Sequence, residues 1–451
     1  LFKGLAMEHL ETKWTKHPVL HFDLSSCKNH DKENLYNILS TMLKLYEDKY
    51  HIEQPFKTLG GRLGYLIEQI HQIENEQVVV IIDEYDAPLL DIMHKDKDFV
   101  DSLRNVMRDF YSPLKSKDYY LRCLFITGIT KFSQLSIFSE INNLTNVSMY
   151  DKYSAICGFT QHELETQLRG YVEDMGKELG LSTDETFNLL KDNYDGYHFS
   201  TNCEDLYNPF SLLTSLKNKS ILNKWFESGT PSYLIQKLKN SKIPLIDLEN
   251  YETKASVFDA PLEENSSIIP LLYHSGYLTI KSSYKSIYTL GYPNKEVREG
   301  LSESLFSNYL NLDKEYSVST SIKVQRALAN DDIDEMLEVT KSFLASIPYD
   351  LHEKREKSYQ LALFILYNLI GEDMVCETRQ AVGRVDAVVK TPTSIFVFEY
   401  KMDKSAQDAL NQIDDKGYMI PFRKDGRKLF KIGVCISSEE RTISEWRVVE
   451  E

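Results

Sequence analysis

The sequence predicts a mixed α/β protein that is divided into more than one domain. At 451 residues the chain is longer than a single hydrophobic core usually supports. Strand-like apolar runs alternate with segments of helical periodicity near its start and again near its end. Between them, residues 160 to 219 show mostly helical periodicity. We therefore expect two α/β domains joined by a mainly helical region.

Composition and charge exclude several classes of protein. Apolar residues make up 42% and charged residues 27% of the chain, as is ordinary for a globular protein. No apolar run approaches the roughly 18 residues of a membrane helix and no secretory leader is evident, so we expect a cytoplasmic protein without a membrane partner. The six cysteines form no C-x-x-C pair, which favours reduced thiols over a zinc ribbon. The net charge of −16 argues against nonspecific coating of nucleic acid.

The first α/β domain is predicted from alternating strands and helices over the first 130 residues. Strand-like runs cover His17–Leu24, Gln77–Asp86 and Leu121–Gly128. Helical periodicity covers Lys32–Tyr50 and Leu59–Glu74. The middle run is continuously apolar, which is typical of a central parallel strand that is buried on both faces. A three-layer α/β domain is the expected result.

Polar residues follow two of these strands. Asp83 and Glu84 end the central strand, and Thr127 ends the next one. An acid pair at this position has the form of a Walker-B element, in which the first acid holds magnesium and the second polarises water. The alternative is a helix N-cap, with Asp86 before Pro88 serving the same purpose. No G-x-x-x-x-G-K-S/T string occurs, so the chain as written lacks the usual means of binding ATP.

The middle of the chain carries two motifs without an obvious chemical role. Asn193–Ser200 places aromatic residues around a glycine, and it is interpreted as a rigid loop in a core or, alternatively, a ligand site. Residues 220 to 293 mix helix with the strand pair Gly276–Ile280 and Ser286–Gly291, which suggests a small module of winged-helix type. Pro293 and Asn294 then begin a helix that runs to Leu310.

The last domain has the predicted order helix, strand, strand, helix, strand. A strongly periodic helix covers Leu351–Ile370. Two short strands, Gly383–Val389 and Ile395–Lys401, flank a turn-type linker. A helix over Ser405–Tyr418 contains a C-cap glycine near its end, and Leu429–Ile436 is the final strand.

Charged residues interrupt the paired strands and define a candidate site. Asp386 lies in the first strand, and Glu399 and Lys401 project from one face of the second because side chains alternate along a strand. Placing these charges on apolar strands is costly unless they bind a metal or do chemistry. Glu356 on the preceding helix is an expected outer ligand, and Gln412 on the following helix could orient water or a phosphate. The alternative is an edge hairpin with a surface Glu–Lys pair.

A basic cluster lies around an Asp-Gly turn before the final strand. Its members are Arg423, Lys424, Arg427, Lys428 and Lys431. Two interpretations stay open, a solvated hairpin tip and a phosphate-facing patch.

These residues carry a resemblance to a known family. The segments Gly383–Asp386, Phe398–Lys401 and Ala409–Tyr418 resemble the C-terminal PD-(D/E)xK nuclease domain of a bacterial family whose chains begin with an AAA-ATPase-like domain. The similar upstream segments are Phe2–Leu5, Ile82–Asp86, Phe125–Gly128, Asn193–Tyr197 and Leu290–Asn294. The resemblance therefore covers essentially the whole chain. It implies a P-loop NTPase-like α/β domain first and a restriction-endonuclease-like α/β domain last.

The resemblance also implies site residues and cofactors. The nuclease positions are Asp386, Glu399, Lys401, Gln412 and Glu356, with Asp386 and Glu399 as ligands of Mg²⁺ or Mn²⁺. The nucleotide-site positions are Asp83, Glu84 and Thr127. The family's P-loop would lie just upstream of Phe2, so ATP is expected only if the full protein carries it.

Three hypotheses follow for the function. In the first, residues 1–159 form an AAA-ATPase-like core, 160–310 a helical lid and winged-helix-like region, and 311–451 a Mg²⁺-dependent nuclease domain that hydrolyses DNA rather than RNA. In the second, the chain is a catalytically silent, nucleotide-responsive switch or scaffold that binds nucleic acid or a protein partner. In the third, both domains serve to assemble a homo-oligomer.

Overall fold

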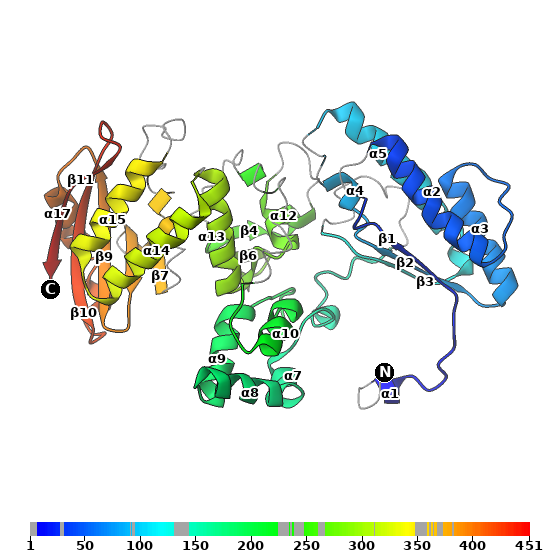
Figure 1. Cartoon of the computed structure of the whole chain (residues 1–451), viewed down its shortest axis with the longest axis horizontal. Helices are drawn as coiled ribbons and strands as arrows, with labels where there is room; N and C mark the ends of the chain where they lie inside the picture. The colour runs from blue at the N-terminus through cyan, green and yellow to red at the C-terminus, as the bar shows by residue number, and fades with distance from the viewer. Residues whose placement is uncertain are drawn as a thin grey trace. The chain divides into compact units, whose positions relative to one another are not determined.

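The structure is a computed structural model of the whole chain (Figure 1). It describes residues 7–27, 31–90, 92, 95–129, 144–223, 234, 237–238, 248–259, 267–310, 312–347, 359, 362–363, 365–367, 373–380 and 383–451. For 306–309, 314, 317, 373–380 and 383–385 the backbone alone is described. Among the described residues, no helix has the length and apolar character that crossing a membrane requires.

The chain divides into two compact units, and the fold is mixed α/β as predicted. The first unit comprises Leu1–Val147, Pro231–Leu234 and Ala255–Ser275. The second comprises Ser148–Thr230, Ile235–Lys254 and Gly276–Glu451. The finer division at residues 159 and 310 stays a prediction.

The first unit is built on a parallel sheet. Its strands are β1 (Val19–Asp23), β2 (Val78–Asp83) and β3 (Leu121–Ile126), in the order β1-β2-β3. Both pairings are parallel, so β2 is the central strand of this sheet, as its apolar run predicts. Alternate residues of β2 are fully buried and the others partly buried.

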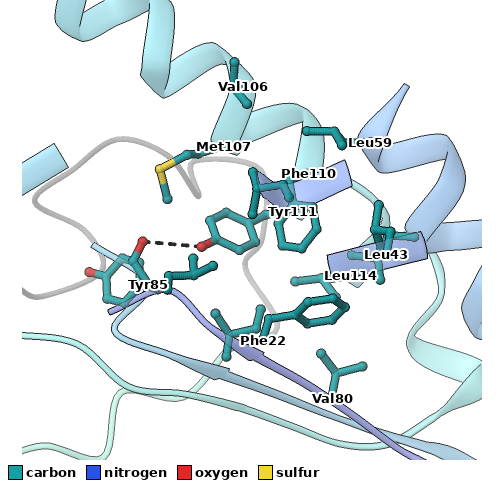
Figure 2. Packing of buried hydrophobic residues seen from close by; sticks show 14 of the residues in the cluster. Phe22, Leu43, Leu59, Val80, Tyr85, Val106, Met107, Phe110, Tyr111 and Leu114 are labelled. Atoms are coloured by element: carbon teal, nitrogen blue, oxygen red, sulfur yellow. Dashed lines mark hydrogen bonds between the residues drawn. The ribbon is translucent and has the colours of Figure 1, made fainter. Parts of the chain in front are cut away.

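Helices pack on this sheet and enclose an aromatic core. They are α2 (Lys32–Lys49), α3 (Leu59–Glu74) and α5 (Lys97–Tyr111), capped by Asp31, Thr58 and Asp96. Figure 2 shows Phe22 from β1 beside Phe110 from α5, with ring centroids 5.2 Å apart in an edge-to-face contact. The Tyr111 hydroxyl donates to the backbone oxygen of Tyr85 over 3.3 Å. The core therefore reaches the segment that follows β2.

The helical part of the second unit follows the predicted periodicity. Its helices are α7 (Gln161–Thr166), α8 (Arg169–Leu179), α9 (Thr183–Tyr194) and α10 (Pro209–Asn218). Thr160 and Glu163 form a capping box at the start of α7. Small and large apolar residues from these helices share one buried cluster.

A small antiparallel sheet follows. It consists of β4 (Tyr251–Lys254), β6 (Ile287–Gly291) and β5 (Thr279–Tyr284), in that order. Strand β6 agrees with the predicted Ser286–Gly291. Strand β5 begins at Thr279 and shares only Thr279 and Ile280 with the predicted Gly276–Ile280, and β4 was not predicted. Asn294 caps α13 (Lys295–Tyr309) by accepting the Val297 N–H, as predicted. The winged-helix interpretation of this module stays a prediction.

The Asn193–Ser200 loop packs on the turn that leads into α13. Asn294 Nδ2 donates to the backbone oxygen of Asp195 over 2.9 Å. Gly196 has φ 96°, and a Cβ there would lie 2.2 Å from the Pro293 oxygen, so only glycine fits. The His198 N–H donates to Thr279 Oγ1 over 2.7 Å. These contacts favour the rigid-loop interpretation.

The last part of the second unit is a mixed five-stranded sheet. Its strands are β7 (Asp373–Gln380), β8 (Gly383–Lys390), β9 (Ser394–Met402), β10 (Lys428–Ser437) and β11 (Thr442–Glu450), in the order β11-β10-β9-β8-β7. The β9–β10 pair is parallel and the other pairs are antiparallel. Helix α17 (Ala406–Asp415) connects β9 to β10 (Figure 1). The sequence pattern predicted β8, β9, α17 and β10 but not the outer strands β7 and β11.

Two further helices attach to this sheet, α14 (Lys314–Ala329) and α15 (Ile333–Ser346). Trp446 Nε1 on β11 donates to Asp334 on α15 over 2.8 Å. The Ser394 hydroxyl at the start of β9 donates to Asp331, between the two helices, over 2.6 Å. In the segment predicted as the Leu351–Ile370 helix, the described residues are helical, and Glu356 lies outside the described residues.

Candidate active site

The end of the β8–β9 ladder brings an acid against the neighbouring strand. The paired residues run from Lys390 and Ile395 to Ala387 and Phe398. Beyond that pair, Asp386 is partly buried, and its Oδ2 accepts the Tyr400 N–H over 2.8 Å. A carboxylate thus takes a place that a backbone carbonyl fills elsewhere in the ladder. This bond fixes the Asp386 side chain beside β9.

Glu399 is the centre of the site. Its side chain is only 2% exposed, and a buried carboxylate is costly unless donors compensate it. Glu399 Oε1 accepts two of them, Lys401 Nζ at 2.6 Å and the Gln412 side-chain amide. Glu399 and Lys401 therefore lie on one face of β9, as the strand alternation predicts.

Gln412 reaches Glu399 because α17 is anchored at its start and along its buried face. Ser405 accepts the Asp408 N–H, and Asp408 accepts the Ser405 N–H in return, which makes a capping box. The apolar side of the helix packs on the sheet through Ala406, Ala409, Leu410 and Ile413. This anchoring holds Gln412, which directly precedes Ile413, beside the Glu399 carboxylate.

The opposite face of β9 is apolar and packed. The rings of Phe398 and Tyr400 stack with centroids 6.2 Å apart. The Tyr400 hydroxyl is hydrogen-bonded to the Tyr367 hydroxyl, and both residues are buried. This packing on the opposite face fixes the backbone of β9, and so it fixes the position of Glu399 between Phe398 and Tyr400.

The donor set fits a hard divalent cation. Asp386 and Glu399 supply carboxylate oxygens, and Mg²⁺ in proteins is commonly held by one or two carboxylates together with water and substrate phosphate. The described residues contain no group of three or more His, Cys, Asp or Glu that could hold a metal ion. The described residues bring two carboxylates, Asp386 and Glu399, to this part of β9, and the predicted outer ligand Glu356 lies outside the described residues.

Tyr418 joins this site although the sequence pattern gave it no role. Tyr418 is 2% exposed and lies in a buried cluster with Ile413 from α17 and Val397 from β9. Burial raises the pKa of the Tyr418 hydroxyl, and the nearby Glu399 and Asp386 act in the same direction. The signal in the sequence is Gly417, because a helix that ends at such a glycine turns the next side chain back toward its own last turns.

The acid pair of the first unit lies at the carboxyl end of the parallel sheet. Asp83 Oδ1 accepts the Thr127 hydroxyl and, over 3.1 Å, the Glu84 N–H. The Tyr85 N–H donates to the Thr127 oxygen over 3.0 Å. The structure thus brings Asp83, Glu84 and Thr127 together, with Glu84 in the left-handed region at φ 48°. The Asp83 carboxylate accepts from the Thr127 hydroxyl and from the Glu84 N–H. An N-cap side chain would accept from a backbone N–H two or three residues later, so these contacts do not support the N-cap alternative for Asp83.

The buried Asp86 has a local structural contact. Its carboxylate accepts the Ile129 N–H over 3.3 Å and is 1% exposed. It therefore joins the turn after β2 to the segment after β3.

Four of the five residues of the basic cluster around the start of β10 form ion pairs with acids of the same chain. Its pairs are Arg423–Glu451, Arg427–Asp425, Lys428–Asp331 and Lys431–Asp414, with nitrogen–oxygen distances of 2.5 to 2.9 Å. Cations that are already paired are less available to phosphate. The structure favours the solvated surface over the phosphate-facing patch.

Comparisons with known proteins match both ends of the chain. A family model described as a predicted AAA-ATPase matches residues 1–138, and a model of the PD-(D/E)XK nuclease superfamily matches residues 354–446. The chain is 30% identical over 455 residues to an uncharacterized protein in the vnfD 5′ region of Azotobacter chroococcum mcd 1. That match covers 98% of this chain and 85% of the relative. No solved structure matches the chain.

Proposed function

Because the chain belongs to the family of this relative and joins an AAA-ATPase-like domain to a PD-(D/E)XK nuclease superfamily domain, we propose that it is a Mg²⁺-dependent nuclease. The proposed substrate is DNA rather than RNA, and the proposed reaction is hydrolysis of a phosphodiester bond. The observation that carries the proposal is the convergence of Asp386, Glu399, Lys401 and Gln412 at the end of the β8–β9 ladder.

The proposed roles follow from the chemistry of each side chain. Asp386 and Glu399 would hold Mg²⁺ or Mn²⁺, which when bound stabilises charge on the phosphate and lowers the pKa of water. Lys401 would orient the attacking water with its ammonium group while it balances the charge of Glu399. Gln412 has a side-chain amide that can hold Glu399 and contact water or a phosphate oxygen. In hydrolysis, the water oxygen bonds to phosphorus, and the leaving oxygen departs with a proton.

The first unit is proposed to control this activity through a nucleotide. Asp83, Glu84 and Thr127 occupy the sheet edge at which α/β domains bind ligands. The printed sequence holds no G-x-x-x-x-G-K-S/T string, so ATP binding is proposed only for a form of the protein that carries one upstream. In that form, ATP binding and its loss after Asp83→Ala would be measured by calorimetry.

The nuclease proposal is tested with the purified chain on a substrate panel. Single-stranded DNA, double-stranded DNA and RNA of matched sequence are incubated with Mg²⁺, with Mn²⁺ and with EDTA. We expect cleavage of DNA with either metal ion, slower cleavage of RNA and none in EDTA. Equal cleavage with and without EDTA would reject the metal requirement, and faster RNA cleavage would reject the DNA preference.

A second candidate is a catalytically silent scaffold that responds to a nucleotide. The observation that favours it is the internal pairing of the basic cluster, together with the net charge of −16. This candidate predicts binding of nucleic acid or a protein partner without metal-dependent cleavage, whereas assembly of a homo-oligomer is the separate third hypothesis. Light scattering and a gel-shift titration, run beside the cleavage assay, separate the two proposals.

A further inference from the structure

Gly433 on β10 is the direct neighbour of Glu399 on β9. The two strands are parallel, and their register pairs these two residues. Paired residues of neighbouring strands point to the same face of a sheet, so a side chain at position 433 would stand next to the Glu399 side chain. Lys431 shares this face of β10, and its ammonium group pairs with Asp414 of α17. Gly433 therefore lies on the face of β10 that α17 covers.

Helix α17 packs closely against Gly433 through its first turns. A Cβ at position 433 would lie well inside 3.0 Å of the Ala406 backbone oxygen. It would also lie 3.0 Å from the Leu410 side chain and 3.1 Å from the Ala409 Cβ. A backbone oxygen cannot rotate aside as the end of a flexible side chain can, so the helix itself would have to move. The observed approach of α17 to the sheet therefore requires glycine at this position.

The same short helix carries Gln412, whose Nε2 donates to Glu399 Oε1. Gln412 follows Ala409 by three residues, so the two residues are neighbours on the helix surface. Because one rigid helix carries both contacts, the depth at which Ala409 packs on Gly433 decides whether the Gln412 amide reaches the carboxylate. We propose that Gly433 is a positioning residue that sets the distance from α17 to the sheet, and so holds the Gln412 amide against Glu399 and this carboxylate in place for the metal ion.

This inference rests on the proposed nuclease function and deepens it. Gly433→Ala adds one methyl group, and the overlap with the Ala406 backbone must move the start of α17 away from the sheet. The Gln412 amide moves with the helix and loses its contact with Glu399. Loss of a partner that orients a metal ligand commonly weakens metal affinity or activity by about 10- to 100-fold.

The matched control is Val434→Ala, a change at the next residue of β10. Val434 is fully buried and pairs with Tyr400, so it faces the side of the sheet opposite to α17. Val434→Ala leaves a cavity on that side and destabilises the domain without pressing on the helix. It therefore separates a loss of stability from a displacement of α17.

The test uses the full chain. Mn²⁺ binding is titrated directly, and cleavage is measured as kcat and KM. We expect Gly433→Ala to weaken Mn²⁺ binding and lower kcat, each by about 10-fold, with KM little changed. Val434→Ala should lower the urea midpoint of unfolding and keep Mn²⁺ affinity and kcat near wild type. Equal Mn²⁺ affinity and kcat for the two variants would overturn the proposal.

A second variant approaches the same contact from the helix side, and it decides the question if Gly433→Ala does not fold. Ala409 is fully buried against position 433. Ala409→Val adds two methyl groups there and should also push α17 from the sheet, with the same loss of Mn²⁺ affinity. A folded Ala409→Val protein with the Mn²⁺ affinity of the wild type would overturn the proposal.

A double variant shows whether Gly433 acts through Gln412. Gln412→Ala already removes the amide, so adding Gly433→Ala should cost little more in Mn²⁺ affinity or in kcat. The loss of stability caused by Gly433→Ala should persist in the double variant. Additive losses of Mn²⁺ affinity would mean that Gly433 acts by another route, and they would overturn the proposal.

The outcomes separate this inference from the proposed function. If the wild type binds Mn²⁺ and cleaves DNA but Gly433→Ala behaves like wild type, only the positioning role fails. If the wild type binds Mn²⁺ without cleaving, the nuclease proposal fails, and the Mn²⁺ titration of the same variants still decides the positioning role. If the wild type does neither, both proposals fail.

Discussion

The backbone N–H of Tyr400 donates a 2.8 Å hydrogen bond to Asp386 Oδ2 and so joins β9 to the carboxylate at the end of β8. The residues on either side of Tyr400 are Glu399 and Lys401. One backbone bond therefore places an acid from β8 beside an acid and a cation from β9. Because the Tyr400 ring is packed on the other face, the geometry of the site depends on a rigid strand.

The first prediction concerns the ammonium group of Lys401. Its Nζ lies 2.6 Å from Glu399 Oε1, and the Glu399 side chain is 2% exposed. Lys401→Met leaves a buried charge with one donor fewer, so the free energy of unfolding should fall by about 2 kcal/mol. Urea denaturation followed by fluorescence measures the loss.

Two further variants complete this experiment. Lys404→Met removes a cation that is exposed just beyond the same strand, and it should change stability by less than about 0.5 kcal/mol. Adding Glu399→Gln to Lys401→Met removes the unpaired charge and should restore most of the loss. Similar effects of Lys401→Met and Lys404→Met would show that the ion pair does not stabilise the fold.

The second prediction concerns Gly196, where the loop meets Pro293. Alanine there keeps an unfavourable φ of 96° and places Cβ 2.2 Å from a backbone oxygen. Gly180→Ala is the matched control, because Gly180 also has a positive φ, 70°, but its Cβ would meet nothing within 4 Å. We expect Gly196→Ala to cost at least about 1 kcal/mol more than Gly180→Ala in thermal or urea unfolding. Equal losses would mean that the loop and the Pro293 turn are not packed as described.

The third prediction is a pH dependence that arises from Asp195. Burial raises the pKa of this carboxyl above its ordinary 3.8, with Asp205 acting in the same direction. Between 3.8 and the raised value the folded state holds more protons than the unfolded state, so the contribution of Asp195 to stability falls as pH rises through this window. Asp195→Asn should remove this slope and gain stability relative to wild type as pH rises. The urea midpoints of the wild type and of Asp195→Asn, measured at pH values above 3.8, check this prediction. If the two midpoints change with pH in the same way, the prediction is contradicted.

The buried strand and helix of the first unit were predicted well, because burial requires apolar residues at regular positions and this regularity is visible in the sequence. The apolar run before Asp83 identified β2 as a central strand, and the Leu59–Glu74 periodicity coincides with α3. The outer strands β7 and β11 were missed because they are edge strands with charged residues, such as Glu445 and Arg447, that interrupt alternation.

Contacts between distant segments could not be predicted in the same way. Strand alternation placed Glu399 and Lys401 on one face, and the structure shows their ion pair. In contrast, the bond from Asn294 to Asp195 joins residues 99 positions apart, and no local pattern encodes it. Tyr418 was missed as a site residue because its place depends on how the chain turns after Gly417.

The most direct test of the central claim is the rate of Mg²⁺-dependent DNA cleavage by Asp386→Asn. Asparagine keeps an oxygen that can accept the Tyr400 N–H, so the fold should persist while the negative charge is lost. Asp415→Asn, which changes an exposed acid on α17, is the control. We predict that Asp386→Asn lowers the cleavage rate by at least about 100-fold and that Asp415→Asn leaves it unchanged. Equal rates for the wild type and Asp386→Asn would contradict the assignment of this site.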